Sequence, residues 1–369
     1  MSSKVVIALN TAWNLVNFRS GLICALLDSG YEVVAVAPPD DYVSRFEELG
    51  CRFVPLPMDN KGTNPGRDLL LLMRFYSLLR RERPAIFLSY TVKPNVYGSL
   101  AAHWLGIPVI NNVAGLGTVF INDTWLTGLV RGLYRLALSR SAKVFFQNED
   151  DRQMFVTKGL VAQSVTERLP GSGIDLVKFS PVPLPDKAPI RFLLIARMLW
   201  DKGVGEFVEA ARILKRCSDS ADFCLLGFTD VQNPAAISLK QMDDWVGEGV
   251  VRYLGVSGNV REEIAQADCI VLPSYREGTP RSLLEAAAMA RPIVTTDTPG
   301  CRDVVKDEVT GFICKARDPA DLAQKMQRIL KMTHSERVLM GRRARMKIEK
   351  EFDEKMVIDS YTAAIESAL

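Results

Sequence analysis

Two glutamates, Glu277 and Glu285, flank a loop that is suited to binding phosphate. The apolar segment 269–272 ends at Pro273, a polar loop follows, and an alanine-rich helix is expected to begin near Arg281. Backbone N–H groups at the positive end of a helix bind phosphate or diphosphate well. The two carboxylates could accept hydrogen bonds from hydroxyls on either side of a diphosphate. A nucleotide sugar has hydroxyls at both ends of its diphosphate, so the loop predicts a site for such a molecule.

Two cations follow another apolar segment. A strand is expected at 190–196, Arg197 comes directly after it, and Lys202 stands just before a helix. An arginine fork and a lysine point charge at a strand end suit two neighbouring phosphates. Taken alone, both could be ordinary surface residues. However, the carboxyl ends of parallel strands share one edge of a sheet, so we expect the cations and the glutamate loop to converge there.

Strand-like apolar runs alternate with helix-period segments along the whole chain, which predicts parallel α/β sheets. The strands expected in the first half lie at 4–9, 32–37, 52–54, 85–89, 108–113 and 144–147. Those in the second half lie at 190–196, 222–226, 250–254, 268–272, 292–296 and 311–314. Segment 180–189 has four prolines and is expected to be a stiff linker.

The linker divides the chain into an N-terminal domain at 1–180 and a C-terminal domain at 181–369. A terminal helix, expected at 355–369, could pack on either domain. Two open sheets joined in this way would place a cleft between them, with strand-end loops of both domains aimed into it. The length of 369 residues agrees with two domains of roughly 150–200 residues each.

The composition excludes several classes of protein. No apolar run approaches the roughly 18 residues needed to cross a bilayer, and no signal peptide is recognisable, so we expect a cytoplasmic protein. The chain has seven dispersed cysteines and two histidines, which offers little for a zinc site or a disulfide framework. Region 60–145 has 11 basic against 3 acidic residues, a net charge of +8, whereas the whole chain is only +3. This local charge suggests an anionic surface or ligand beside the first domain.

The chain resembles the retaining glycosyltransferases of family 4 over nearly its whole length. The specific signals are Arg197 with Lys202, and the E-x7-E pattern of Glu277 and Glu285 within EGTPRSLLEAAAMARPIVTTDTPGCRDVV. The resemblance implies the GT-B architecture, an α/β fold of two facing Rossmann-like domains with parallel sheets. Segments SYTVKPNVYGSLAA, NNVAGLGTVF, VFFQNEDDRQMF and LPGSGIDLVKFSP resemble the capsular-polysaccharide and N-glycan branch. That branch includes enzymes that transfer N-acetylgalactosamine to undecaprenyl-diphosphate-linked bacillosamine.

This resemblance implies a role for each residue of the predicted donor site. Arg197 and Lys202 would bind the diphosphate of a UDP-sugar and stabilise it as it leaves. Glu277 would contact the donor sugar, which makes it the third predicted catalytic residue, and Glu285 would bind the ribose hydroxyls. The remaining predicted donor-binding residues lie in the same loop or in the turn 255–260, which would recognise the base: Gly278, Thr279, Arg281, Gly255 and Val260.

Acceptor binding is assigned to the first domain. Lys93, in loop 90–95, could face an acceptor phosphate, although an ordinary exposed lysine is an equal alternative. Loop 111–118 follows another expected strand, and its glycines allow close approach to a ligand. Many family members have a Gly-Gly pair where this chain has TAWNLVNFRSG at 11–21, so side chains there must replace a backbone contact. The predicted acceptor-binding residues are Asn17, Lys93, Asn112 and Gly115.

Two segments, 67–84 and 124–143, mix leucine and aromatic residues with arginine at near-helical spacing. Interfacial helices have this pattern, and so do core-packing helices with a solvated arginine face. A lipid-linked acceptor favours at least one of them touching the inner face of the cytoplasmic membrane. We therefore expect a peripheral membrane protein whose partners are a UDP-sugar and a polyprenyl-diphosphate-linked saccharide, and we expect no nucleic-acid partner.

The resemblance implies retaining transfer of an N-acetylhexosamine from a UDP-sugar, with N-acetylgalactosamine the best match. No D-x-D motif occurs, so we expect neither a metal nor any other cofactor, with cations and helix N–H groups neutralising the departing UDP. The alternatives are another UDP-sugar donor, a non-lipid acceptor, a glycoside hydrolase that uses Glu277 and Glu285, a UDP-sugar epimerase, and a non-catalytic UDP-sugar-binding subunit of a membrane complex.

Overall fold

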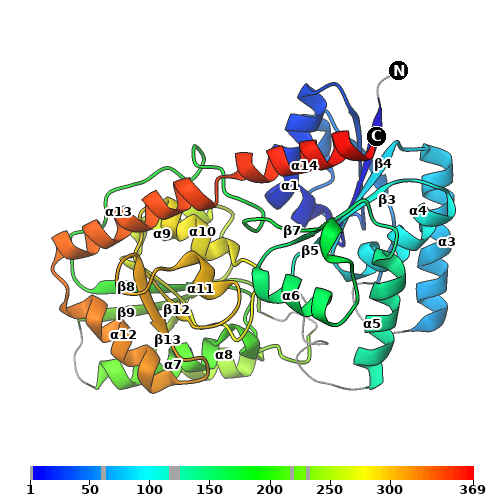
Figure 1. The fold of residues 1–369 in the computed structure, drawn as a ribbon. Helices are drawn as coiled ribbons and strands as arrows, with labels where there is room; N and C mark the ends of the chain where they lie inside the picture. Colours follow the sequence, from blue (N-terminus) through cyan, green and yellow to red (C-terminus); the bar gives the residue numbers. More distant parts are fainter. Residues whose placement is uncertain (1–2, 60–63, 116–124, 217–219, 230–232) are drawn as a thin grey trace. The chain divides into compact units, whose positions relative to one another are not determined.

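The computed structural model describes residues 3–59, 64–115, 125–216, 220–229 and 233–369, without the side chains of residues 125–127. The chain divides into two compact units (Figure 1). Unit 1 comprises Met1–Gly173 together with Glu354–Leu369, and unit 2 comprises Ile174–Asp353. Each unit is an open parallel sheet covered by helices on both faces.

The sheet of unit 1 has the order β3-β2-β1-β4-β5-β6-β7. Its strands are β1 (Lys4–Ala8), β2 (Glu32–Ala37), β3 (Arg52–Pro55), β4 (Ile86–Tyr90), β5 (Val109–Val113), β6 (Lys143–Phe146) and β7 (Thr166–Arg168). The first six were predicted to within one residue at each end. The seventh was missed because it is a three-residue edge strand, Thr-Glu-Arg, without an apolar signal.

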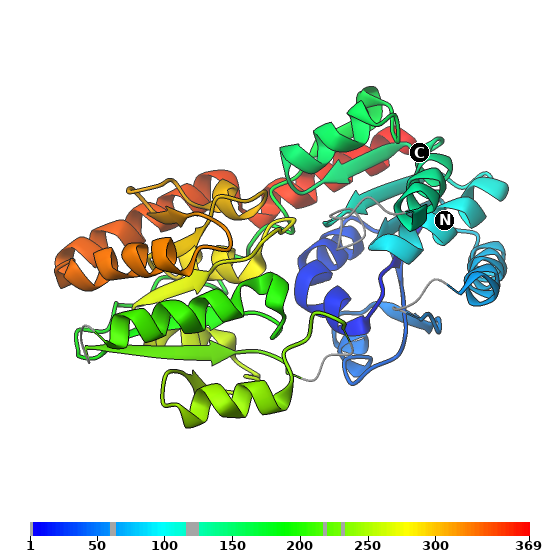
Figure 2. The same cartoon turned by 90° about the horizontal axis from the view of Figure 1, so that it is seen from below.

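Helices cover both faces of this sheet (Figures 1 and 2). Alternate residues of β1 show the two sides: Val5 and Ile7 pack with α1 (Ala12–Asp28) and α14 (Glu354–Ala368), whereas Val6 packs with α3 (Pro65–Glu82) and α4 (Ser99–Trp104). A π-helical turn, η1 (Pro94–Gly98), leads into α4. The remaining helices of unit 1 are α2 (Ser44–Glu48), α5 (Trp125–Leu138) and α6 (Glu149–Thr157), and a 3-10 turn, η3 (Gln163–Val165), precedes β7.

The sheet of unit 2 has the order β10-β9-β8-β11-β12-β13. Its strands are β8 (Ile190–Ile195), β9 (Ala221–Leu226), β10 (Arg252–Tyr253), β11 (Cys269–Leu272), β12 (Ile293–Thr296) and β13 (Gly311–Cys314). All six were predicted, although β10 is shorter than expected. Its helices are α7 (Val204–Lys215), α8 (Leu239–Gly247), α9 (Val260–Gln266), α10 (Arg281–Ala288), α11 (Cys301–Val304), α12 (Pro319–Lys331) and α13 (His334–Glu351), with a 3-10 turn, η4 (Trp200–Lys202), before α7.

The strand order reverses at one place in each sheet. In unit 1, β1 lies between β2 and β4, and in unit 2, β8 lies between β9 and β11. The connections after β1 and β4 therefore diverge from one crevice at the carboxyl edge, as do those after β8 and β11. Ligands of open α/β sheets bind at such switch points.

The boundary between the units lies earlier than the predicted linker at 180–189. That segment packs on unit 2 because one arginine binds its backbone and a second arginine binds the residue just before it. Arg291, which is fully buried, donates to the carbonyls of Val182 and Pro183 at 3.0 and 3.1 Å, and Arg345 donates to the carbonyl of Phe179 at 2.8 Å. Buried guanidinium groups need acceptors, and this proline-rich backbone supplies them.

The terminal helix α14 begins at Glu354 and belongs to unit 1, where it lies beside α1 (Figure 1). Its Tyr361 is fully buried, and the Tyr361 hydroxyl accepts a hydrogen bond from the Asn112 amide at 3.0 Å. Val357 and Ile365 extend the same core. The last helix therefore completes one face of the sheet in unit 1, although the chain reaches it by way of unit 2.

Candidate active site

The loops after β8 and β11 are bound together at the switch point of unit 2. The backbone N–H of Tyr275 donates to the carbonyl of Asp201 at 3.0 Å, and the Ser274 hydroxyl donates to the same carbonyl at 3.1 Å. Ser274 is fully buried and Asp201 is the middle residue of η4. These bonds place the loop that carries Lys202 directly against the loop that carries Glu277.

Two glycines permit this close approach. Gly203 has φ 71°, and a Cβ there would lie 2.1 Å from the carbonyl oxygen of Pro273. Gly300, just before α11, has φ 79°, and a Cβ there would lie 2.1 Å from the carbonyl oxygen of Gly278. No other residue type could occupy either position without moving the backbone. The predicted donor loop is therefore in backbone contact with the connections after both β8 and β12.

Lys202 and Glu277 form an ion pair across these two loops. Their side chains are only 17% and 15% exposed. Arg197 is exposed, and its side chain makes no hydrogen bond or ion pair within the described part of the chain. The predicted diphosphate ligands thus differ: Lys202 is already paired with a carboxylate, whereas the Arg197 guanidinium can reach a bound anion.

Glu285 lies on the first turns of α10 and pairs with Arg281, with Nε 3.2 Å from Oε1. The Glu285 side chain is 12% exposed, and this burial raises its pKa, while the Arg281 charge opposes the shift. Pro280 precedes the helix and supplies no side-chain cap. The start of α10 thus combines an uncapped helix end with one cation and one carboxylate, as an anionic and hydroxyl-rich ligand requires.

The other predicted donor residues follow neighbouring strands at the same edge. Gly278 is buried and Thr279 half-buried within the loop after β11. Gly255 has φ 73° and its carbonyl accepts the N–H of Gly227 at 2.8 Å, which links the ends of β9 and β10. Val260 is the first residue of α9. The structure therefore brings all the predicted donor residues to the carboxyl edge of one sheet.

Sequence reasoning missed a support beneath this site. The Tyr275 hydroxyl donates to Glu206 Oε1 at 2.5 Å, from the loop after β11 to the first turn of α7. The guanidinium of Arg317 lies 4.4 Å from the centre of the Tyr275 ring. Burial and the neighbouring Glu206 raise the pKa of Tyr275, so its hydroxyl keeps its proton and remains a donor. The available signal was a tyrosine two residues before Glu277, in a loop otherwise rich in small and polar residues.

The predicted acceptor residues of unit 1 are more dispersed. Asn112 is fully buried and bound to Tyr361, and Lys93 pairs with Asp68 at 2.8 Å with both side chains largely buried. Asn17 donates to the carbonyl of Trp13 on its own helix at 2.9 Å. Gly115 has φ 136° and is the last described residue of loop 111–118, whose remainder lies outside the described residues. The amide nitrogen of Asn112 is thus engaged by Tyr361, and an internal ion pair engages Lys93.

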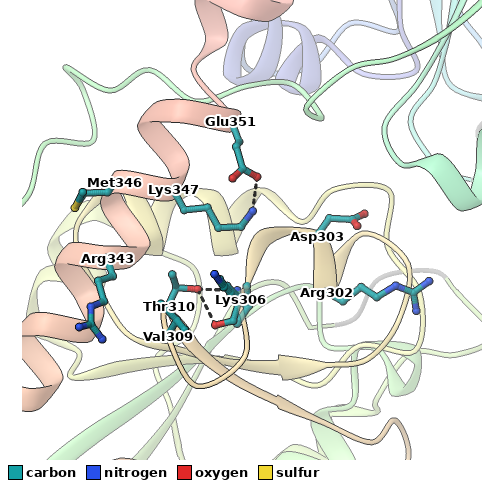
Figure 3. A pocket seen from close by; sticks show the side chains of 10 residues that line it. Arg302, Asp303, Lys306, Val309, Thr310, Arg343, Met346, Lys347 and Glu351 are labelled. Carbon is teal, nitrogen blue, oxygen red and sulfur yellow. Dashed lines mark hydrogen bonds and ion pairs between the residues drawn. The ribbon is translucent and has the colours of Figure 1, made fainter.

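A surface hollow of about 470 Å³ lies elsewhere on unit 2, beside α11 and α13 (Figure 3). It includes none of the predicted donor residues. Lys347 points to Glu351, with which it is ion-paired, and the hydroxyl of Thr310 accepts the backbone N–H of Lys306 at 2.8 Å. The hollow therefore contributes nothing to the site at the switch point.

The described residues include neither a metal-binding cluster nor a membrane-spanning helix. No group of three or more histidine, cysteine, aspartate or glutamate side chains there is placed to hold a metal ion. Metal independence remains a prediction. Among the same residues, no helix is both long and apolar enough to cross a membrane.

Comparison with known proteins identifies the family. Residues 17–170 match the family described as "Glycosyl transferase 4-like domain", and residues 189–332 match "Glycosyl transferases group 1". The N,N′-diacetylbacillosaminyl-diphospho-undecaprenol α-1,3-N-acetylgalactosaminyltransferase of Campylobacter jejuni is 33% identical over 338 residues, which cover 86% of each chain. The UDP-Gal:α-D-GlcNAc-diphosphoundecaprenol α-1,3-galactosyltransferase of Escherichia coli is 23% identical over 68% of each chain.

Solved structures show the same fold. Sucrose-phosphate synthase from Thermosynechococcus elongatus superposes with a TM-score of 0.81 at 17% identity, over 99% of this chain and 98% of its own. Anabaena HepE in complex with UDP-glucose gives a TM-score of 0.79 at 14% identity over the whole of both chains. The predicted family and the predicted pair of Rossmann-like domains with parallel sheets are both confirmed. The chain therefore belongs to glycosyltransferase family 4, the group 1 glycosyl transferases.

Proposed function

We propose that the protein transfers an N-acetylhexosamine, with N-acetylgalactosamine the first candidate, from a UDP-sugar to an undecaprenyl-diphosphate-linked saccharide, with retention of configuration. The observation that carries the proposal is the convergence of Arg197, Lys202, Glu277 and Glu285 at the switch point of unit 2. The relatives support the acceptor class, because two of them are transferases that act on diphosphoundecaprenol-linked sugars.

In the proposed donor complex, Arg197 and Lys202 hold the diphosphate. The uncapped start of α10 adds backbone N–H groups. Glu285 accepts hydrogen bonds from the ribose hydroxyls, and Glu277 accepts them from the sugar. Each carboxylate is paired with a cation of its own site, Lys202 or Arg281, which favours binding roles over the acid and base of a hydrolase.

The proposed reaction needs no nucleophile from the protein. An acceptor hydroxyl oxygen forms a bond to the anomeric carbon while the bond from that carbon to the β-phosphate oxygen breaks. The departing phosphate oxygen takes the acceptor proton, and UDP leaves from the same face, so configuration is retained. Arg197 and Lys202 stabilise the negative charge that grows on the leaving group, and we propose that they do so without a metal ion.

Product analysis tests this proposal. The full-length protein is incubated with a panel of UDP-sugars and a lipid-linked acceptor, and the products are identified by mass spectrometry and NMR. We expect an extended lipid whose new linkage has the anomeric configuration of the donor. Free sugar would indicate a hydrolase, an epimerised UDP-sugar an epimerase, and binding without any product a non-catalytic subunit. Each of these three results would contradict the proposal.

We also propose that α3 lies on the anionic membrane surface that carries the acceptor. Its outer face exposes three neighbouring apolar side chains, Leu69, Leu70 and Met73, each at least half exposed. Arginines flank them, and Arg74 donates to the carbonyl of Pro57 at 2.8 Å. A helix with exposed apolar residues between arginines binds at a lipid interface. The other candidate segment, 124–143, contains α5, and its first residues lie outside the described side chains.

Vesicle sedimentation tests the role of α3. We expect the protein to sediment with phosphatidylglycerol vesicles and much less with phosphatidylcholine vesicles. The triple variant with Leu69, Leu70 and Met73 changed to serine should remain in the supernatant. Leu339→Ser is the matched control, because Leu339 is 48% exposed on α13 of unit 2 and its loss should not change sedimentation with vesicles. Equal sedimentation of the triple variant and the control would contradict this placement.

A further inference from the structure

The first helix of unit 1 contains a buried cation. Arg19 is only 5% exposed, in the apolar stripe that α1 forms with Leu15, Leu22 and Ile23. Its Nη1 donates to the carbonyl of Phe18 at 3.2 Å, and its guanidinium lies 4.5 Å from the centre of the Tyr90 ring. No carboxylate pairs with it anywhere in the described part of the chain. A buried guanidinium without a counter-ion is costly, and buried charges are normally paired.

This cation and two residues of the cluster around it contain three polar atoms without a hydrogen-bond partner. Within the described residues, Arg19 Nε, the Tyr90 hydroxyl and Asn112 Oδ1 are all buried without a hydrogen-bond partner. They belong to one cluster: Arg19 contacts Tyr90, the Tyr90 ring lies 5.9 Å from the Tyr361 ring, and Tyr361 is bonded to Asn112. Buried polar groups in native proteins usually have partners, so a cluster of orphans indicates a place where a polar ligand or water completes the bonding.

The cluster lies at the switch point of unit 1. Arg19 belongs to the helix that follows β1, Tyr90 is the last residue of β4, and these two strands are neighbours where the order reverses. Side chains on a helix lean towards its N-terminus, and α1 starts from the carboxyl end of β1, so Arg19 leans towards the edge where ligands of such sheets bind. In unit 2 the corresponding place, after β8 and β11, has Lys202 and Glu277.

We propose that Arg19 is the anion-binding residue of unit 1 and contacts phosphate oxygens of a prenyl-diphosphate acceptor. The orphaned donors of Arg19 and Tyr90 suit an anion with several acceptor oxygens, and a guanidinium fork binds phosphate oxygens in pairs. The identity of the acceptor rests on the proposed function, whereas the binding of a diphosphate at Arg19 does not. Among the predicted acceptor residues, Lys93 is engaged by Asp68, which leaves Arg19 as the better-placed cation.

Thermal unfolding of the full-length protein tests binding without any transfer. Geranyl diphosphate and UDP are added separately to the wild type, Arg19→Gln, Arg19→Lys and the control Arg45→Gln, whose arginine is exposed on α2. Each shift is measured from the Tm of that variant alone, so a general loss of stability does not count. We expect geranyl diphosphate to raise the Tm of the wild type and of Arg45→Gln, to act weakly on Arg19→Lys and not at all on Arg19→Gln. UDP should stabilise all four proteins equally.

Three outcomes of the melting experiment would overturn the proposal: no shift with geranyl diphosphate in the wild type, an undiminished shift in Arg19→Gln, or loss of the UDP shift in Arg19→Gln, which would assign Arg19 to the donor. Kinetics separate this proposal from the proposed function. Where transfer is observed, Arg19→Gln should raise the KM for the lipid-linked acceptor about 10- to 100-fold, as expected for a lost charge-assisted hydrogen bond, with the KM for the donor unchanged. If transfer is active and the acceptor KM is unchanged in Arg19→Gln, the role of Arg19 is refuted but the proposed function is not. If transfer is absent and the Tm shift with geranyl diphosphate is intact, the proposed function is refuted but the role of Arg19 is not.

Discussion

The ammonium group of Lys202 is paired with the carboxylate of Glu277, across the connections that follow neighbouring strands β8 and β11. Both side chains are largely shielded from solvent, so breaking the pair by removing one partner would leave an uncompensated charge. A donor diphosphate that binds Lys202 has to share the ammonium with Glu277. The pair therefore links the diphosphate end of the proposed donor site to its sugar end.

Glu277→Gln should affect the diphosphate end and the sugar end of the proposed donor site differently. UDP has no sugar for Glu277 to contact, and the variant removes a negative charge near its diphosphate. We expect UDP to bind as tightly as to the wild type or up to about tenfold tighter, while transfer from the UDP-sugar becomes slower. Calorimetric titration with UDP and initial rates measure the two effects. Glu308→Gln, at an exposed ion pair with Arg328, is the control. Weaker UDP binding together with an unchanged rate would refute this coupling.

Burial of Glu285 predicts a pH dependence. Its pKa is raised, and in its proposed role the carboxylate is a stronger acceptor for ribose hydroxyls than the protonated acid. Affinity for UDP should therefore fall as the pH drops through a pKa above that of an ordinary glutamate. Glu285→Gln should bind UDP more weakly at neutral pH, and its affinity should no longer fall as the pH drops. Titrations with UDP at a series of pH values check both points. If the affinity of the variant still falls at acidic pH, another group causes the fall.

The same raised pKa has a consequence for stability. The folded protein holds the Glu285 proton more tightly than the unfolded chain, so the contribution of this group to stability grows as the pH falls through its folded pKa. Above that pKa the buried carboxylate is a cost. Unliganded Glu285→Gln should therefore melt at the same or a higher temperature than the wild type at neutral pH, and a clearly lower Tm would contradict the assigned shift.

Gly203 should tolerate no side chain. Its φ of 71° opposes alanine, and so does the Pro273 carbonyl oxygen, which lies 2.1 Å from the place that a Cβ would occupy. We expect Gly203→Ala to lower the free energy of unfolding by at least about 2 kcal/mol and to weaken UDP binding, since Lys202 is its neighbour. Gly247→Ala is the control, because nothing lies within 4 Å of a Cβ there. Denaturant titrations that give the two variants equal stability would contradict the packing described.

Tyr275 and Glu206 should behave as a coupled pair. Tyr275→Phe removes the hydrogen bond of 2.5 Å and leaves the Glu206 carboxylate without it; Oε2 of Glu206 already lacks a partner among the described residues. We expect a loss of about 1–3 kcal/mol in the free energy of unfolding and weaker UDP binding. Adding Glu206→Gln removes the stranded charge and should recover part of the stability. A double-mutant cycle measures the coupling free energy between the two residues. Purely additive effects would show that their hydrogen bond does not stabilise the fold.

The regular elements were predictable because their signals are local. Buried parallel strands such as β1 and β11 are short apolar runs, and the proline-rich segment 180–189 was correctly read as non-helical. The boundary between the compact units lies before this segment, at Gly173, because Arg291 binds the segment to unit 2 and Arg345 binds the preceding Phe179. These contacts join positions more than 100 residues apart. No local pattern specifies such bonds.

The candidate site was likewise predictable only where its signals are local. The order of motifs after β8 and β11 was enough to place Lys202 beside Glu277, since parallel strands share a carboxyl edge. The support from Glu206 to Tyr275 and the burial of Arg19 depend on tertiary packing. The burial of Arg19 had one signal in the sequence, which is its position in the apolar stripe of α1. The role of Asn112 as an acceptor ligand stays a prediction; its bond to Tyr361 of the last helix joins positions 249 residues apart and has no local signal in the sequence.

We propose that the switch point of unit 2 is the donor site of this glycosyltransferase. The most direct measurement compares the rate of acceptor extension by the wild type, Lys202→Ala, Glu285→Ala and the control Lys215→Ala, whose lysine binds the carbonyl of Gly249 at the far end of α7. Melting curves establish that each variant is folded. We expect Lys215→Ala to keep its activity, while the other two variants lose at least about 100-fold. Full activity in both Lys202→Ala and Glu285→Ala would contradict this proposal.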